Sequence, residues 1–223
     1  MADRVAVEAG ASSRERLYRG LELVVLFGLA PAVFVWLRTT SIEPPIIPSI
    51  LLFMLLCAAI LMGDAGFRFH ASWRKCISPS ELRRVLGYFA AGAVALGLAT
   101  ANAAPGDFFR FPIETPGSWL LVMCVYPLLS VLPQEFVYRV FFFHRYRGLL
   151  TNPAARIMVS AVAFGWVHVA FGSWISVVLS GIGGVLFAWS YERTRSLRLV
   201  WLEHALYGCC VFTVGLGQYF YAK

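Results

Sequence analysis

Seven long apolar runs constrain the fold of this chain more than any other feature of its sequence. A helix needs about 20 apolar residues to cross the hydrocarbon of a bilayer, and these runs have roughly that length. Backbone polar groups in lipid must pair within the protein, which favours helices for runs of this kind. We therefore predict an all-α fold, a polytopic transmembrane helical bundle of about seven spans. The runs are Leu21–Leu37, Ile46–Met62, Leu86–Ala104, Trp119–Phe143, Ile157–Phe171, Trp174–Tyr191 and Leu197–Phe220.

Composition excludes a soluble globular domain. Of the 223 residues, 59% are hydrophobic and 14% are charged, and the mean hydropathy is +0.71. A soluble fold of this size needs a much larger polar surface. The net charge of +7 does not indicate nucleic acid, because the basic residues form short tracts beside apolar runs and not one basic face. We expect the lipid bilayer as a partner and no nucleic acid.

The basic tracts also predict an orientation, since positive residues accumulate in cytoplasmic loops. Tracts of arginine or lysine precede the first run and follow the second, fourth and sixth, whereas the alternate loops carry few charges. This alternation predicts a cytoplasmic N-terminus and a multi-pass protein of the bacterial inner (cytoplasmic) membrane. We divide the chain into a cytoplasmic N-terminal segment, residues 1–20, and a single transmembrane bundle, residues 21–223.

Ionisable residues inside the predicted spans are costly unless they are paired or face a wet cavity, and four of them are candidates for a functional site. The fourth span carries Glu135 and Arg139 four residues apart on one helix face, the fifth carries His168 and the seventh carries His204. Counting about 1.5 Å per residue from the flanking arginines puts the carboxylate and both imidazoles at depths of roughly 14 to 18 Å. Three helices thus present these groups at one level, which predicts a shared site.

The same span contains two prolines, Pro127 and Pro133, which should kink it or divide it into two half-helices. Pro133 immediately precedes the pair Gln134 and Glu135. On a regular helix these two side chains point about 100° apart, so an irregular helix is needed before both can serve one site.

A carboxylate with two imidazoles in a wet pocket suits hydrolysis, because a base must take a proton from water and further donors must hold the oxyanion. Other interpretations remain open. Glu135 and Arg139 also fit a plain ion pair, each histidine alone also fits a packing role, and buried ionisable residues with a proline-broken helix also occur in transporters. His144 and Glu22 are interpreted as interfacial or structural, and the glycines at 181, 183 and 184 as helix-packing residues.

Several known catalytic patterns are missing from the sequence. It contains no HExxH, GxSxG or GxGD, which argues against zinc, serine and aspartyl intramembrane chemistry of those kinds. The five cysteines have no CxxC spacing and most lie in apolar runs, so they indicate neither a disulfide framework nor a zinc site. We predict no cofactor and no metal.

Three short motifs resemble those of the CAAX protease and bacteriocin-processing membrane proteins, also called the Abi or type II CAAX prenyl endopeptidase family. The family motifs are EExxxR, FxxxH and HxxxN or HxxxD, in that order on successive apolar segments. Here they correspond to Gln134-Glu135 with Arg139, to Phe164 with His168, and to His204 with Gly208. The motif region extends over about residues 119–220.

The resemblance implies a glutamate-type intramembrane endopeptidase that acts on a membrane protein or peptide. In the family, the first glutamate and the second-motif histidine activate water, the last histidine and its Asn stabilise the oxyanion, and the arginine orients the glutamates. The catalytic residues implied here are Glu135, Arg139, His168 and His204, with Gln134, Tyr207 and Phe164 as support for the substrate or the oxyanion.

Two positions depart from the family pattern. Gln134 replaces the first glutamate, and a neutral amide cannot accept a proton from water. Gly208 replaces the Asn and removes one oxyanion donor, which Tyr207 or nearby backbone would have to supply. One hypothesis is therefore an active variant with Glu135 as the base. The alternative is a weak or inactive relative that binds a membrane peptide or a partner protein. The substrate stays open.

Overall fold

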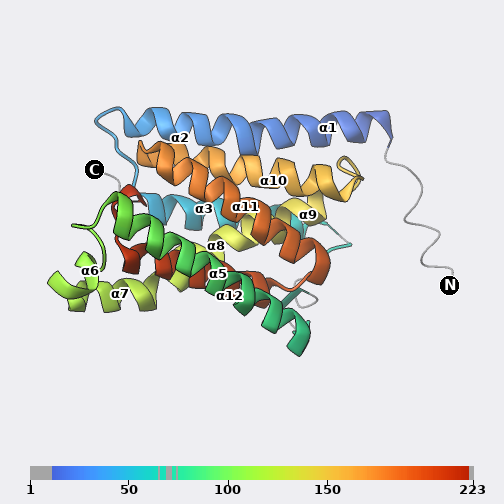
Figure 1. Ribbon diagram of the computed structural model, residues 1–223. Coiled ribbons are helices and arrows are strands. Elements are labelled where there is room, and N and C mark those ends of the chain that lie inside the picture. Colours follow the sequence, from blue (N-terminus) through green and yellow to red (C-terminus); the bar gives the residue numbers. More distant parts are fainter. Residues whose placement is uncertain (1–11, 65, 69–71, 74, 221–223) are drawn as a thin grey trace.

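The computed structural model describes residues 12–64, 66–68, 72–73 and 75–220, whose regular elements are all helical, with no strand among them (Figure 1). This arrangement confirms the predicted all-α bundle. Residues 1–11 of the proposed N-terminal segment lie outside the described residues. The first helix begins at Ser13, so it starts before the predicted first span, with Ser12 accepting a hydrogen bond from the Glu15 amide as its cap.

The helical segments of the described residues follow one another along the chain. They are α1 (Ser13–Val24), a π turn (Val25–Leu29), α2 (Ala30–Arg38), α3 (Ile46–Met62), α5 (Pro79–Ala103), α6 (Arg110–Glu114), α7 (Pro116–Tyr126), a π turn (Pro127–Val131), α8 (Leu132–Glu135), a π turn (Phe136–Phe141), α9 (Phe142–Arg145), α10 (Pro153–Val167), a 3₁₀ turn (His168–Phe171), α11 (Trp174–Thr194), α12 (Leu197–Val214) and a 3₁₀ turn (Leu216–Phe220).

These segments form continuous apolar helices at each of the seven predicted positions. Six are long and apolar enough to cross a membrane: Ser13–Arg38, Pro79–Ala103, Pro116–Arg145, Pro153–Phe171, Trp174–Thr194 and Leu197–Val214. The remaining one, α3, is apolar but has only 17 residues. About seven spans is therefore close to what the described residues show.

The central span, α7 to α9, is continuous but irregular. Each of the two prolines lies near a change in helix type. One π turn begins at Pro127, and a second one, Phe136–Phe141, follows Pro133. A proline has no amide hydrogen to donate, which favours a local change in the pattern of helical hydrogen bonds. The prolines therefore widen the helix at two places without dividing it. Such π turns occur frequently at functional sites.

Close packing of glycines joins α10 to α11. An added Cβ atom on Gly165 would lie 3.3 Å from the Gly181 Cα atom, and one on Gly184 would lie 3.1 Å from the Ala161 Cα atom. Small residues at such contacts let helix backbones approach in a membrane. The connection between these helices ends at Gly172, whose φ of 65° suits glycine. His168 is thereby held beside the start of α11.

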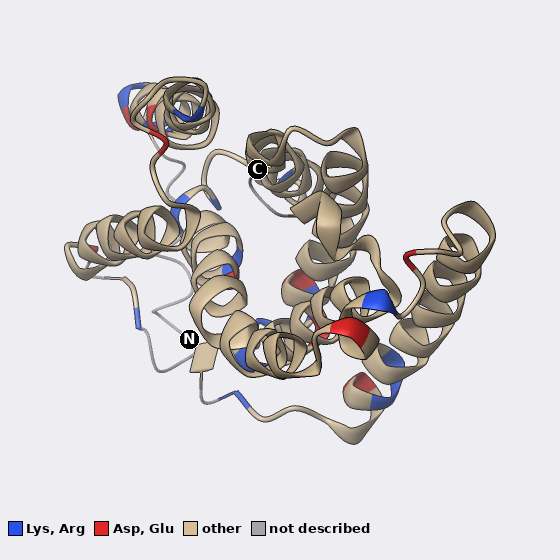
Figure 2. Cartoon of the chain, turned by 90° about the vertical axis from the view of Figure 1, so that its left-hand side faces the viewer, with Lys and Arg blue, Asp and Glu red and all other residues tan. Residues whose placement is uncertain are grey.

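Ion pairs tie together the ends of several helices. Arg145 at the end of α9 makes two hydrogen bonds of 2.8 Å to Glu22 of α1. Arg156 of α10 likewise donates to both carboxylate oxygens of Glu192 on α11, at 3.1 and 2.7 Å. Paired contacts of this kind fix orientation as well as charge. Figure 2 shows how few blue and red segments the otherwise tan bundle contains.

Candidate active site

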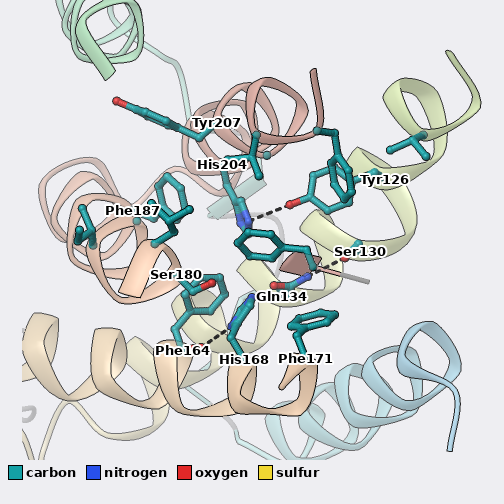
Figure 3. Close-up of a pocket in the computed structure, with 18 of the residues that line it drawn as sticks. Tyr126, Ser130, Gln134, Phe164, His168, Phe171, Ser180, Phe187, His204 and Tyr207 are labelled. Carbon is teal, nitrogen blue, oxygen red and sulfur yellow. Dashed lines mark hydrogen bonds between the residues drawn. The ribbon is translucent and has the colours of Figure 1, made fainter. Parts of the chain in front are cut away.

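A cavity of about 710 Å³ lies among α3, α5, α7, α8, α10, α11 and α12. Its lining is mainly aliphatic and aromatic. None of its lining residues in the described part of the chain is Lys, Arg, Asp or Glu. The polar lining side chains come from Tyr126, Ser130, Gln134, His168, Ser180, His204 and Tyr207, and Figure 3 shows several of them around the pocket. An apolar chamber with few polar groups suits an apolar ligand or peptide segment.

Glu135 pairs with a histidine and an arginine behind the wall of this cavity. Its Oε1 atom lies 2.8 Å from His204 Nδ1, and its Oε2 atom lies 3.2 Å from Arg139 Nε. The side chains of Glu135 and Arg139 are both 0% exposed. The carboxylate therefore reaches the cavity only through His204, while the guanidinium offsets its charge.

The environment of Arg139 explains how a guanidinium stays buried here. Its Nη1 atom donates to the Ser160 hydroxyl at 2.7 Å, and this hydroxyl donates to the Tyr138 carbonyl at 2.9 Å. The guanidinium also lies 5.2 Å from the centre of the Phe164 ring. Phe164 in turn packs against His168 and His204, with ring centres at 4.7 and 5.5 Å. Phe164 thus supports both histidines and the arginine at once.

His168 receives a different kind of support. Its Nδ1 atom lies 2.7 Å from the Phe164 carbonyl oxygen, which can only accept. Nδ1 therefore carries the hydrogen in the neutral ring, and Nε2 carries the lone pair. Because Nδ1 is tied back to its own helix, Nε2 is the atom left for the cavity that His168 lines. The neutral His168 ring therefore offers its Nε2 lone pair to the cavity, whereas a carboxylate lies behind His204.

Of the adjacent pair in the fourth span, Gln134 lines the cavity and Glu135 does not. The Gln134 amide donates to the Ser130 hydroxyl at 2.8 Å, as the dashed line in Figure 3 marks. The π turns on either side leave α8 as a single helical turn, and Gln134 is its cavity-facing residue. The irregular helix expected from Pro133 is present, yet it leaves Glu135 behind the cavity wall.

Each predicted site residue therefore has a definite place. Gln134, Phe164, His168, His204 and Tyr207 line one cavity, and Glu135 and Arg139 lie behind it. The Tyr207 side chain points away from His204 and toward α5. Its hydroxyl would be 3.0 Å from a Cβ atom added to Gly92 on α5. Figure 3 shows the Tyr207 side chain directed away from the group formed by Gln134, His168 and His204.

Comparison with known families matches residues 116–210 to the type II CAAX prenyl endopeptidase Rce1-like family. This segment of the chain is Rce1-like. The match confirms the resemblance that the three motifs indicate. At family level it supports a CAAX-protease-like intramembrane endopeptidase. Comparisons with curated proteins and with solved structures give no match.

The Rce1-like segment runs from the start of α7 into α12 and contains every predicted site residue. The helices α3 and α5 precede it and still contribute lining residues, among them Ile46 and Gly92. The 3₁₀ turn Leu216–Phe220 follows it and brings Phe220 to 6.1 Å from His168, between ring centres. The cavity is therefore completed by parts of the chain outside the Rce1-like segment.

Two residues of the Rce1-like segment escaped the sequence analysis. Tyr126, at the end of α7, places its hydroxyl 3.4 Å from His204 Nε2. A lone tyrosine inside an apolar run, here Trp119–Phe143, gives no signal of its own. Glu203 is 0% exposed, and neither of its carboxylate oxygens accepts a hydrogen bond of good geometry from the described residues. In the sequence, Glu203 stands directly before His204, and none of the three motifs gives it a role.

Proposed function

We propose that this chain is an intramembrane endopeptidase that hydrolyses a peptide bond of a membrane-associated or lipidated protein or peptide. The observation that carries the proposal is the unlike support of two histidines on one apolar cavity. A carbonyl stands behind His168, and a carboxylate stands behind His204. One imidazole is thus prepared to take a proton and the other to hold a positive charge.

His168 is the general base in this proposal. Its Nε2 lone pair takes a proton from a water molecule in the cavity, and the remaining hydroxide attacks the carbonyl carbon of the substrate. The Phe164 carbonyl keeps the hydrogen on Nδ1 and so keeps the correct tautomer. Gln134, which lines the cavity but cannot accept this proton, is assigned to hydrogen bonding with water or substrate.

His204 stabilises the oxyanion. In its protonated form, Nε2–H donates to the oxygen that gains charge, and the Glu135 carboxylate at Nδ1 stabilises the imidazolium. When the tetrahedral intermediate collapses, the carbon–nitrogen bond breaks and the leaving amine takes the proton from His168. Glu135 acts through His204 and is a positioning residue. Arg139 orients Glu135 through their ion pair.

The cavity lining supports an apolar substrate segment. No Lys, Arg, Asp or Glu among the described lining residues is available to pair with a charged substrate group. Burial of an unpaired charge is costly, so the residues next to the scissile bond should be uncharged.

We further propose that the chain resides in a bacterial inner membrane with its N-terminus in the cytoplasm, which the alternation of basic loops supports.

A comparison of membrane proteomes tests the activity. Cells without the native gene receive wild-type protein, His168→Gln or His204→Gln at matched levels, and new peptide termini are quantified by mass spectrometry. The proposal expects termini that appear with wild-type protein and disappear with both variants. A set of termini that is identical in all three strains would contradict it.

A binding function is the second candidate, and the position of Gln134 favours it. Where the family pattern has a glutamate, an amide lines the cavity, so no carboxylate among the described residues lines the space that a peptide would occupy. In this case the chain holds a membrane peptide without cutting it. Gln134→Glu discriminates between the two functions. New cleavage that appears only in this variant would support binding as the native function, whereas wild-type cleavage would support the peptidase.

A further inference from the structure

We propose that the Tyr126 hydroxyl donates a hydrogen bond to the oxyanion. It would take the role of the Asn side chain in the family's HxxxN motif, where this chain has Gly208. This inference rests on the proposed peptidase function and deepens it. The hydroxyl of Tyr126 lies beside His204 Nε2, the atom assigned to the oxyanion. Tyr126 is then a catalytic residue, because it touches the reacting oxygen.

Gly208 and Tyr126 share one space. Gly208 follows His204 by four residues on α12, so a side chain there would lie on the same helix face. A Cβ atom added to Gly208 would collide with the Tyr126 hydroxyl and ring, with 2.7 Å to Cζ. Cβ atoms do not approach ring carbons that closely. The phenol of Tyr126 therefore occupies the volume that an Asn at position 208 would need.

The ring of Tyr126 is held in place by its neighbours. Its centre lies 5.2 Å from that of Phe212 at 71° and 6.4 Å from that of His204 at 81°, both in edge-to-face geometry. Tyr126 is also the last residue of α7 before the π turn that begins at Pro127. These contacts aim the hydroxyl at His204 Nε2 and into the cavity, as Figure 3 shows.

The chemistry needs only a hydrogen bond from Tyr126. With neutral His204, the phenol hydroxyl donates to the Nε2 lone pair. With protonated His204, Nε2–H and the hydroxyl both donate to the oxyanion, and no proton leaves the phenol. An oxyanion thus receives two donors from Tyr126 and His204, the number that the family pattern obtains from its histidine and Asn. Loss of one such donor typically slows an enzyme by about 10²–10³.

Four variants test the pairing: Tyr126→Phe, Tyr126→Ala, Gly208→Asn and the double variant Tyr126→Ala with Gly208→Asn. Tyr88→Phe on α5 is the matched control, since Tyr88 lies outside the cavity lining. Each protein is purified in detergent, its melting temperature is measured, and kcat and KM are measured on a peptide cut by the wild type. Tyr126→Phe should lower kcat about 10²–10³-fold with little change in KM or melting temperature.

The double variant gives the sharpest outcome. Gly208→Asn alone should lower both the melting temperature and kcat, because the amide has no room. Adding Tyr126→Ala should restore the melting temperature and recover at least about tenfold in kcat over Tyr126→Ala alone, because a donor returns. Unchanged kcat in Tyr126→Phe, or effects of the two substitutions that simply add, would overturn the pairing.

The experiment also separates this inference from the proposed function. If folded wild-type protein cuts peptides and Tyr126→Phe cuts them equally well, only the role of Tyr126 is overturned. If neither the wild type nor the double variant cuts any peptide, the peptidase function itself is overturned, and the role of Tyr126 is overturned with it. The melting temperatures then report steric coupling alone.

Discussion

His204 joins Glu135 to the cavity, with Nδ1 2.8 Å from the carboxylate and Nε2 3.4 Å from the Tyr126 hydroxyl. The same carboxylate lies 3.2 Å from the Arg139 guanidinium, and both side chains are fully buried. The group is therefore coupled, because removal of any one charge leaves another without its partner in an apolar environment.

Glu135→Gln should be strongly destabilising. The substitution keeps the size of the side chain but leaves the Arg139 charge buried without a carboxylate. Breaking a buried ion pair in this way costs about 3–5 kcal/mol. The measurement is the melting temperature of the purified protein in detergent, together with cleavage. A stable Glu135→Gln protein with normal activity would show that the pair with His204 and Arg139 has no role.

Glu203→Gln is the matched comparison on the neighbouring buried carboxyl group. Glu203 has the same burial as Glu135, but its oxygens accept no well-formed hydrogen bond from the described residues. Burial of a carboxylate without a well-formed hydrogen bond is costly, so we expect its neutral replacement to change stability by between zero and about 2 kcal/mol in favour of the folded state. A loss of stability equal to that of Glu135→Gln would mean that Glu203 has a strong partner.

Gln134→Glu should increase cleavage. The new carboxylate would line the cavity that His168 also lines and could accept a proton from water. General bases contribute about 10²–10⁴ in rate, and since His168 already provides part of this, we expect a gain of about tenfold. The assay is kcat on a peptide cut by the wild type. A decrease in kcat with unchanged folding would contradict the assigned role of Gln134 in the cavity.

Two glycines of α11 should respond in opposite ways to alanine. In Gly184→Ala the new methyl group would lie 3.1 Å from the Ala161 Cα atom, so α10 and α11 must separate. Overpacking of this kind costs about 1–3 kcal/mol. In Gly181→Ala the methyl group meets nothing within 4 Å, and helix propensity favours alanine by up to about 1 kcal/mol. Melting temperatures of both variants check the prediction, and equal shifts would contradict the packing.

The fold could be predicted from the sequence more completely than the details of the site. Run length predicted each apolar helix, because hydrocarbon thickness fixes the length of a span. Distances from flanking arginines predicted that Glu135, His168 and His204 lie at one level, and the structure brings Glu135 and His204 into contact and His168 to the same cavity. These predictions depend on spacing along a helix, which is local.

What spacing could not provide is the direction of each side chain on an irregular helix. Pro133 predicted an irregularity but not its form, and the π turns around α8 decide that Gln134 lines the cavity while Glu135 lies behind it. The contact of Tyr126 with Gly208 joins residues 82 positions apart in sequence. A glycine in place of a larger motif residue indicates that space is available, but only the packing shows that the Tyr126 side chain fills it.

The most direct test of the central claim is peptide cleavage in water enriched in ¹⁸O by purified wild-type protein and by His168→Gln. The account predicts that the wild type produces a new C-terminal carboxylate carrying a single ¹⁸O atom, because cavity water attacks the peptide directly. His168→Gln, with an unchanged melting temperature, should form this product at least about 10²-fold more slowly. Equal rates in the two proteins, or no product from folded wild-type protein, would contradict the account.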